Sequence, residues 1–233
     1  EAACALARDG RVEALMKGSL HTDELLGAVV DRAKGLRTDR RMSHVFIMDV
    51  PTYPRPLFIS DAAINIAPDL ATKADIVRNA IDCAHALGVP EPRVAVLAAV
   101  ETVHPNMPAT LDAAALCKMA DRGQIEGAII DGPLAFDNAV SPEAAERKGI
   151  RSAVAGRADI LIVPDIEAGN MMAKQLFYLA AAQSAGLVMG ARVPIMLTSR
   201  ADGRLSRLAS AAAALLVARR QKSMRAAKQD SPA

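Results

Sequence analysis

The stretch that decides the fold is Asp159-Ile160-Leu161-Ile162-Val163-Pro164-Asp165-Ile166-Glu167-Ala168-Gly169-Asn170. Its first half is a short apolar run rich in β-branched side chains, which predicts a buried strand over 159–164. Its second half is polar and leads into helical spacing over 170–184. A strand that ends in a polar junction before a helix is the repeating unit of α/β proteins, so this stretch indicates that class.

The same alternation extends outward in both directions along the chain. Helical spacing predicts helices over 1–8, 23–34, 73–87, 109–122, 142–148 and 205–220. Apolar runs predict strands over 12–16, 45–49, 57–60, 93–100, 127–131, 187–190 and 193–199. Because strands separated by helices pair in parallel through crossover connections, we expect an α/β fold with largely parallel sheets.

Composition fits this class and excludes one group of partners. The chain has 233 residues, 52% of them hydrophobic and 23% charged, which is enough for one large core or two modest ones. Aromatic residues make up 3%, so alanine and the aliphatic residues supply the apolar mass that parallel strands and their helices bury. The net charge of +2 creates no overall field that would draw the protein to nucleic acid.

The cysteines and the apolar runs bear on the compartment. Cys4, Cys83 and Cys117 fit neither a disulfide framework nor a CxxC metal site, so a reducing cytoplasm is the simplest location. Charged residues interrupt each long apolar stretch before it reaches the roughly 20 residues of a bilayer span, and we expect no membrane association. The chain begins at Glu1 inside a predicted helix, so we expect it to be part of a longer protein.

One polar junction after a predicted strand is Thr198-Ser199-Arg200-Ala201-Asp202-Gly203. Ligands of open α/β sheets bind beyond the carboxyl ends of strands. Arg200 can hold two phosphate oxygens through its planar guanidinium, and Ser199 can donate to a phosphate oxygen or to a developing negative oxygen. By spacing alone, the same residues are more typical of a helix cap with a surface ion pair.

Two further polar clusters occupy similar positions. Asn170 is predicted to open a helix, where free backbone N–H groups suit an anion, and Lys174 lies one turn later on the same face. A capped helix with a solvent-exposed lysine is the more common meaning of that pattern. The second cluster follows the first predicted strand and contains Ser19, His21 and Thr22. Three isolated histidines receive no functional role, because lone histidines are usually structural: His44, His85 and His104.

Several common catalytic motifs are missing from the sequence. GxGxxG, GxxxxGK[ST], HExxH and GxSxG do not occur, which argues against dinucleotide, nucleoside triphosphate, zinc-protease and serine-hydrolase sites. Asp131 and Asp165 are expected to end neighbouring strands, but neither has a second carboxylate or a histidine at ligand spacing. No metal site is therefore expected.

Four blocks, taken together and in order, resemble the signatures of the phosphate acetyltransferase and phosphate butyryltransferase family. They are Asp131-Gly132-Pro133-Leu134-Ala135-Phe136-Asp137, Ser152-Ala153-Val154-Ala155-Gly156, Pro164-Asp165-Ile166-Glu167-Ala168-Gly169-Asn170 and Thr198-Ser199-Arg200-Ala201-Asp202. Residues 14–22 and 61–69 look most like the branch of the family in which the transferase follows an enoyl-CoA hydratase-like module. The resemblance thus implies such a module upstream of this chain.

The resemblance also implies a fold similar to isopropylmalate and isocitrate dehydrogenases. Two α/β domains would enclose the active site in the cleft between them, and the protein would be a homodimer. The first domain would comprise residues 1–36 and 186–233, with its N-terminal part missing, and the second would comprise residues 37–185.

The implied reaction is acyl-CoA + phosphate = acyl phosphate + CoA, with direct attack of the CoA thiolate in a ternary complex. Coenzyme A is then a substrate, and no covalently bound cofactor is expected. Arg200 matches the family's phosphate-binding arginine, and Ser199 matches the serine beside the reacting carbonyl. The expected substrate-binding residues are Ser19, His21, Thr22, Asp131, Asp165, Asn170 and Lys174.

Two departures from the family pattern keep a second function open. Ser206 stands where acetyl-specific enzymes carry an aspartate proposed to deprotonate CoA, and Gly27 stands where many relatives carry an arginine. A non-catalytic domain that binds acyl-CoA, as in malic enzymes with a transferase-like C-terminal region, is therefore the alternative. A dehydrogenase on the same fold is a third hypothesis, against which the missing nicotinamide and metal motifs argue.

Overall fold

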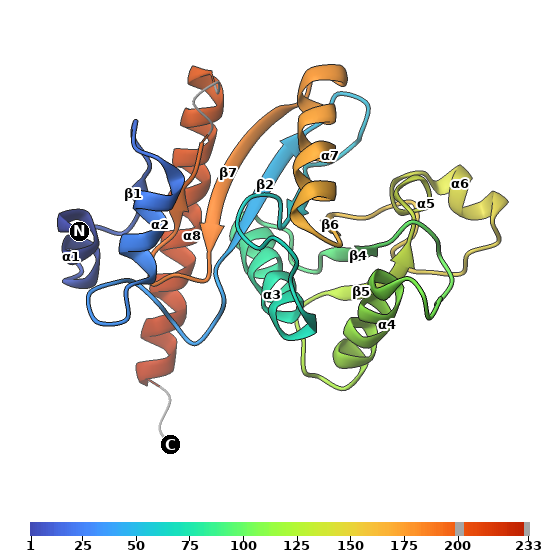
Figure 1. Cartoon of the computed structure of the whole chain (residues 1–233), viewed down its shortest axis with the longest axis horizontal. Helices are drawn as coiled ribbons and strands as arrows, with labels where there is room; N and C mark the ends of the chain where they lie inside the picture. The colour runs from blue at the N-terminus through green and yellow to red at the C-terminus, as the bar shows by residue number, and fades with distance from the viewer. Residues whose placement is uncertain (199–202, 231–233) are drawn as a thin grey trace.

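The computed structural model of the chain, shown in Figure 1, describes residues 1–198 and 203–230. The described strands form one sheet in the order β1-β8-β7-β2-β3-β6-β4-β5, with helices on both faces. The α/β class predicted from the sequence is confirmed.

The elements follow the predicted alternation, except that the helix at Phe136–Val140 was not predicted and the helix predicted over 170–184 ends at Leu179, before a strand begins at Gln183. The strands are β1 (Leu15–Met16), β2 (Ser43–Asp49), β3 (Leu57–Ser60), β4 (Arg93–Leu97), β5 (Ile129–Leu134), β6 (Ile160–Ile162), β7 (Gln183–Met189) and β8 (Ile195–Met196). The helices are α1 (Ala2–Arg8), α2 (Thr22–Val30), α3 (Leu70–Ala86), α4 (Pro108–Asp121), α5 (Phe136–Val140), α6 (Pro142–Arg147), α7 (Ile166–Leu179) and α8 (Arg204–Asp230).

The sheet is parallel on both sides of an antiparallel centre. Among the described strands, β1–β8, β3–β6, β6–β4 and β4–β5 are parallel pairs. β2 pairs antiparallel with both β3 and β7, and β7 pairs antiparallel with β8. The connections at this centre, residues 50–56 and 190–194, are too short for the crossover of about a dozen residues that a parallel pair requires.

The two faces of the β2–β7 pair contact different helices. Side chains alternate between the faces of a strand, so Val45 and Leu187 point toward α3 and α8 and join the largest buried cluster. On the opposite face, Met48 joins a second cluster with residues of α7, and Val188 joins a third with residues of α1 and α2.

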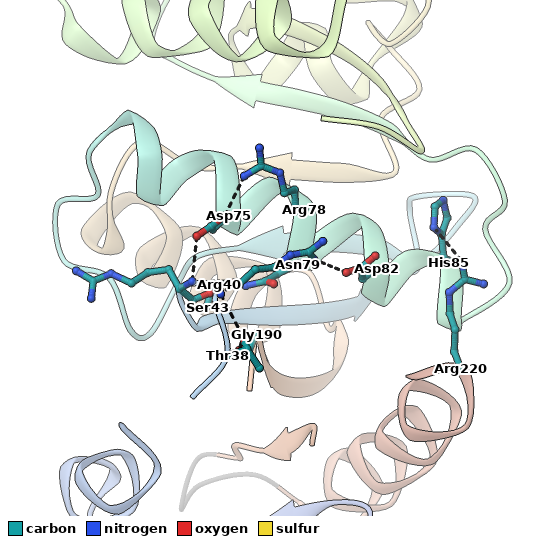
Figure 2. A network of polar contacts seen from close by, with 11 residues as sticks. Thr38, Arg40, Ser43, Asp75, Arg78, Asn79, Asp82, His85, Gly190 and Arg220 are labelled. Carbon is teal, nitrogen blue, oxygen red and sulfur yellow. Dashed lines mark hydrogen bonds and ion pairs between the residues drawn. The ribbon is translucent and has the colours of Figure 1, made fainter. Parts of the chain in front are cut away.

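Polar contacts join the start of β2 to α3 and join Thr38, in the segment before β2, to Gly190 after β7 (Figure 2). Asn79, buried on α3, donates to the backbone oxygen of Arg41 at 2.8 Å and to Oγ of Ser43 at 2.9 Å. Thr38 donates through Oγ1 to the backbone oxygen of Gly190 at 2.6 Å. Because the buried Asn79 satisfies its amide N–H groups on Arg41 and Ser43, these contacts fix the start of β2 against α3.

Helix α7 begins four residues before the position predicted from its apolar spacing. Asp165 is its N-cap, and its carboxylate accepts from the backbone N–H of Ala168 at 2.8 Å. Gly169 therefore lies within the first turns rather than at the start. A β-carbon at Gly169 would lie 2.8 Å from the backbone oxygen of Asp61, so glycine allows α7 to approach the loop after β3.

Helix α8 continues ten residues beyond its predicted end at Arg220. Residues 221–230 contain no proline or glycine, and Lys222 forms an ion pair with Glu13 at 2.9 Å. Arg225 also donates to the backbone oxygen of Arg192. Among the helices that the structure describes, none is both long enough and apolar enough to cross a bilayer.

Candidate active site

A cavity of about 290 Å³ lies over the central strands, between α2 and α7. Helix α2 belongs to the first predicted domain, and α7 belongs to the second. The floor comes mainly from β2, and the walls come from α7, from Thr22 of α2 and from Ala63 of the loop after β3.

The floor is formed by alternate residues of β2. His44, Phe46 and Met48 point to the same face and line the cavity. Ser184 of β7, which pairs with Met48 across the ladder, lines it as well. The chain after β8 adds Leu197 at the edge of this floor.

The wall formed by α7 brings together two residues that the sequence predicted to share a face. Asn170 and Lys174 both line the cavity, one turn apart. The side-chain amide of Asn170 donates to the backbone oxygen of Ala62 at 3.2 Å, which fixes its orientation against the loop after β3. That loop is itself held by Asp61, whose carboxylate accepts from the backbone N–H groups of residues 63–65.

The polar loop after β1 reaches the cavity through one residue. Thr22 lines the cavity at the start of α2, whereas Ser19 and His21 are exposed and are not part of the lining. Lys17, with its side chain largely buried, donates to the backbone oxygen of Leu20 at 3.1 Å and holds the loop in place. Binding roles for Ser19 and His21 stay predictions.

The two predicted aspartates lie apart from the lining. Asp165 caps α7, and Asp131 lies on β5, where its carboxylate accepts from the backbone N–H of Gly132 at 2.8 Å. The expectation that these residues end neighbouring strands is wrong, because β4 lies between β6 and β5. Three strands separate β5 from the cavity floor on β2, so the structure does not bring Asp131 to this cavity. Substrate binding by either aspartate stays a prediction.

Ser199 and Arg200 lie outside the described residues. Thr198, which precedes them in the chain, is buried and lines the cavity. The catalytic roles expected of the pair are taken up below as proposals.

The sequence analysis missed the residues on the cavity floor. His44 is 1% exposed, and its ring packs edge-to-face against Phe46 with the ring centroids 4.3 Å apart. Gly186 lies opposite Phe46, and a β-carbon there would come 2.9 Å from Nε2 of His44. The alternation of His44, Phe46 and Met48 along the predicted strand could have indicated that they share one face. They were missed because a lone histidine in an apolar strand is usually a buried structural residue.

Two other positions bear on which residue could accept the proton of the CoA thiol. Ser206 is buried at the start of α8, and its backbone oxygen accepts from the Ser210 hydroxyl at 2.7 Å. Gly27 lies on α2 with open space around the position of a β-carbon. Within the described part of the chain, no three His, Cys, Asp or Glu side chains are grouped so that they could hold a metal ion.

Together these features define an α/β protein with a cavity over its central strands that polar and apolar side chains line together. A lysine, an amide and hydroxyl groups lie there beside aromatic and thioether side chains. Such a lining suits a small substrate with an anionic head and an apolar tail.

Comparison with known proteins identifies the family. Residues 1–215 match the family model described as "Phosphate acetyl/butaryl transferase", and the chain belongs to this family of acyltransferases. Its members transfer an acyl group between coenzyme A and phosphate, which confirms the function implied by the four sequence blocks.

Individual relatives agree with this assignment. The chain is 63% identical to the phosphate acetyltransferase of Rhizobium meliloti over 225 residues, covering 97% of this chain and 71% of the relative. It is 65% identical over 198 residues to the phosphate acetyltransferase of Rickettsia felis, covering 84% of this chain and 57% of that relative's length. The regulatory alternative receives no support from these relatives.

A solved structure shows the same fold. The crystal structure of a branched-chain phosphotransacylase from Enterococcus faecalis V583 superposes with a TM-score of 0.85 at 34% identity. The superposition covers 93% of this chain and 78% of that one.

Proposed function

We propose that the protein containing this chain catalyses the reversible transfer of a short acyl group between coenzyme A and inorganic phosphate. The observation that carries the proposal is the meeting of Thr22, Asn170 and Lys174 in one cavity beside Thr198. A phosphate group needs cationic and hydrogen-bonding partners of this kind, and the family match supplies the reaction.

In the direction of thioester formation, the thiolate of CoA attacks the carbonyl carbon of the acyl phosphate. The carbon–sulfur bond forms, the bond from carbon to the phosphate oxygen breaks, and phosphate leaves with the electron pair. No acyl-enzyme is required, so catalysis depends on alignment of the two substrates and on stabilisation of the negative charge. Lys174 is assigned to the phosphate charge, and Asn170 and Thr22 are assigned to its oxygens.

Ser199 and Arg200 complete the proposed site. Arg200 would bind the leaving phosphate, and Ser199 would donate to the carbonyl oxygen as negative charge develops on it. Their position directly after the cavity residue Thr198 supports this assignment.

The remaining expectations belong to the same proposal. Residues 1–36 and 186–233 would form one domain and residues 37–185 the other, with α2 and α7 facing each other across the cavity. The full-length protein would be a cytoplasmic homodimer that acts on CoA, acyl phosphate and phosphate, and an enoyl-CoA hydratase-like module would precede this chain.

The test is an assay of the full-length protein with CoA and acetyl or butyryl phosphate, following thioester formation. Arg200→Ala should lose at least about tenfold in kcat/KM, because it removes a partner of the transition-state charge. Lys174→Ala should lose activity as well, whereas Gln175→Ala, on the next exposed position of α7, should not. Absence of turnover with any short acyl phosphate would refute the proposed function.

A further inference from the structure

Only a few side chains in the cavity could exchange a proton. Among the lining residues that the structure describes, the titratable ones are His44 on β2 and Lys174 and Tyr178 on α7. Lysine and tyrosine side chains ordinarily keep their protons up to about pH 10, whereas an imidazole changes its charge between about pH 5 and 8. His44 is therefore the lining residue whose chemistry suits a base near neutral pH.

The imidazole of His44 extends across the neighbouring strand toward β8. Leu197 donates through its backbone N–H to the backbone oxygen of Gly186 on β7 at 3.1 Å, so these two residues lie side by side. A β-carbon at Gly186 would lie 2.9 Å from Nε2 of His44 and 2.6 Å from the backbone oxygen of Leu197. The ring thus lies beside the chain that leads from β8 to Thr198.

This position brings the imidazole to the groups assigned to the acyl phosphate. Lys174, assigned to the phosphate charge, lines the same cavity from the α7 wall. Ser199 and Arg200, assigned to the carbonyl oxygen and the phosphate, follow the lining residue Thr198 directly in the chain. An acyl phosphate held by these groups presents its carbonyl carbon in the cavity, so the attacking thiol must enter the space that His44 lines.

The other elements around the cavity supply no competing base among the described residues. The remaining polar side chains of the lining do not ionise near neutral pH, and they are Thr22 on α2, Asn170 on α7, Ser184 on β7 and Thr198 after β8. The carboxylate of Asp61, in the loop after β3, accepts from the backbone N–H groups of residues 63–65 and from the side-chain amide of Asn65. Nζ of Lys17, at the end of β1, donates to backbone oxygens of its own loop.

We propose that His44 is the proton acceptor for the thiol of coenzyme A. This inference rests on the proposed function, and it fills the role that Ser206 cannot serve. In thioester formation the sulfur–hydrogen bond breaks as the imidazole takes the proton, the carbon–sulfur bond forms, and the bond from carbon to the phosphate oxygen breaks. Phosphate leaves with the electron pair, takes the proton from the imidazolium and departs as HPO₄²⁻. In the reverse reaction the imidazolium protonates the departing thiolate of CoA.

The value of a base follows from the acidity of thiols. A thiol with a pKa of about 8.5 is about 3% ionised at pH 7 and about 75% ionised at pH 9. A positioned base typically contributes about 10²- to 10⁴-fold to the rate. A variant without the base depends on thiolate that is already present in solution, so its rate should rise with pH in proportion to the ionised fraction.

Two substitutions remove the base and keep a polar side chain. His44→Gln and His44→Asn can form hydrogen bonds, but an amide does not accept a proton near neutral pH. The matched control is His85→Gln, because His85 lies on α3 outside the cavity lining and forms a hydrogen bond through Nε2 with the backbone oxygen of Gly127 at 2.8 Å.

The experiment measures kcat/KM for CoA at saturating acyl phosphate from pH 5 to pH 9, with the full-length protein and its three variants, and the Tm of each. The wild-type value should fall about tenfold per pH unit on the acid side, as the base becomes protonated. Both His44 variants should lose at least about 10²-fold at pH 7, and this deficit should shrink by about 20-fold at pH 9. His85→Gln should follow the wild-type profile.

Three results would overturn the assignment. A deficit of the His44 variants that stays constant from pH 7 to pH 9, with an unchanged Tm, would give His44 a structural role and leave the proposed function intact. A wild-type profile without a decline down to pH 5 would exclude a histidine base, even where neither His44 variant folds. Absence of turnover by the wild-type protein would refute the function and the base together.

Discussion

Gly186 of β7 lies beneath the imidazole of His44 on β2, so that a β-carbon at position 186 would come 2.9 Å from Nε2 of that ring. The same β-carbon would lie 2.6 Å from the backbone oxygen of Leu197. The lack of a side chain at Gly186 thus makes room for a histidine on the cavity floor and for the chain that leads from β8 to Thr198.

Gly186→Ala should destabilise the fold and reduce activity together. The backbone oxygen of Leu197 cannot yield as a flexible side chain would, so β8 must shift, and overpacking of this kind costs about 1–3 kcal/mol. Thermal unfolding should show a drop in Tm of several degrees.

The control for this substitution is Gly27→Ala on α2. A β-carbon at Gly27 meets no atom within 4 Å, so the substitution should raise stability by about 0.4–1 kcal/mol through helix propensity and the unfolded state. An unchanged Tm in Gly186→Ala would contradict the close contact with Leu197.

The ion pair between α3 and α4 should be worth far more than a surface pair. Nζ of Lys73 lies 2.7 Å from Oδ2 of Asp112, and the Lys73 side chain is 6% exposed. Asp112→Ala leaves a buried ammonium without its partner and should lower the free energy of unfolding by about 3 kcal/mol in urea titrations.

The matched control is the exposed pair of Lys118 with Asp121, whose side chains are 64% and 61% exposed. Asp121→Ala should change stability by less than about 0.5 kcal/mol. The double variant Lys73→Met with Asp112→Leu should recover most of the loss, because it removes the unpaired charge. Equal losses in Asp112→Ala and Asp121→Ala would show that burial of Lys73 does not matter.

Most of the secondary structure between residues 90 and 180, α5 (Phe136–Val140) excepted, could be predicted from the sequence because its causes are local. Apolar runs of a few residues form β4 and β6, and helical spacing forms α4 and α7. The start of α7 was misplaced because the decisive contact is the cap at Asp165, not the spacing of apolar residues. The extension of α8 past Arg220 depends in part on contacts with Glu13 and Arg192, which are remote in the sequence.

The candidate site was predictable only in part, since it depends on the order of strands. Asn170 and Lys174 share a helix face, which spacing reveals, and the structure places both at the cavity. Asp131 was grouped with them because it was predicted to end a strand, but it lies within β5, and the sheet order carries β5 to the far edge. The floor residues were missed because nothing local tells which face of β2 is covered by helices and which is open.

The buried thiol of Cys83 should make stability fall at high pH. Burial, together with the nearby charge of Asp82, raises the pKa of Cys83 from 9.0 to about 12. The unfolded chain loses this proton above about pH 9 while the folded protein keeps it, so the folded state binds more protons and stability falls as pH rises.

The slope should be about 1.4 kcal/mol per pH unit for this thiol between pH 9 and its folded pKa. Urea titrations of the wild-type protein and of Cys83→Ala measure the difference, and the variant should show a shallower decline. Burial also raises the pKa of Cys117 to about 12, with a further contribution from Asp131. Iodoacetamide at pH 8 should therefore leave both thiols unmodified in the folded protein. Rapid native-state alkylation of Cys83 would contradict its burial.

Asp165 offers a test of whether a residue in a signature block binds substrate or only supports the site. Its carboxylate accepts from the backbone N–H of Ala168, so Asp165→Ala should cost about 1 kcal/mol and fray the start of α7, whereas Asp165→Ser keeps a capping oxygen and should retain the Tm. Because Asn170 lies in the second turn of that helix, fraying should also raise the KM for acyl phosphate in the alanine variant.

We expect the serine variant to keep kcat/KM within about twofold of wild type, since the carboxylate is engaged by the helix and lies outside the cavity lining. A loss above tenfold in Asp165→Ser at unchanged Tm would instead support the direct contact with substrate that the sequence predicts.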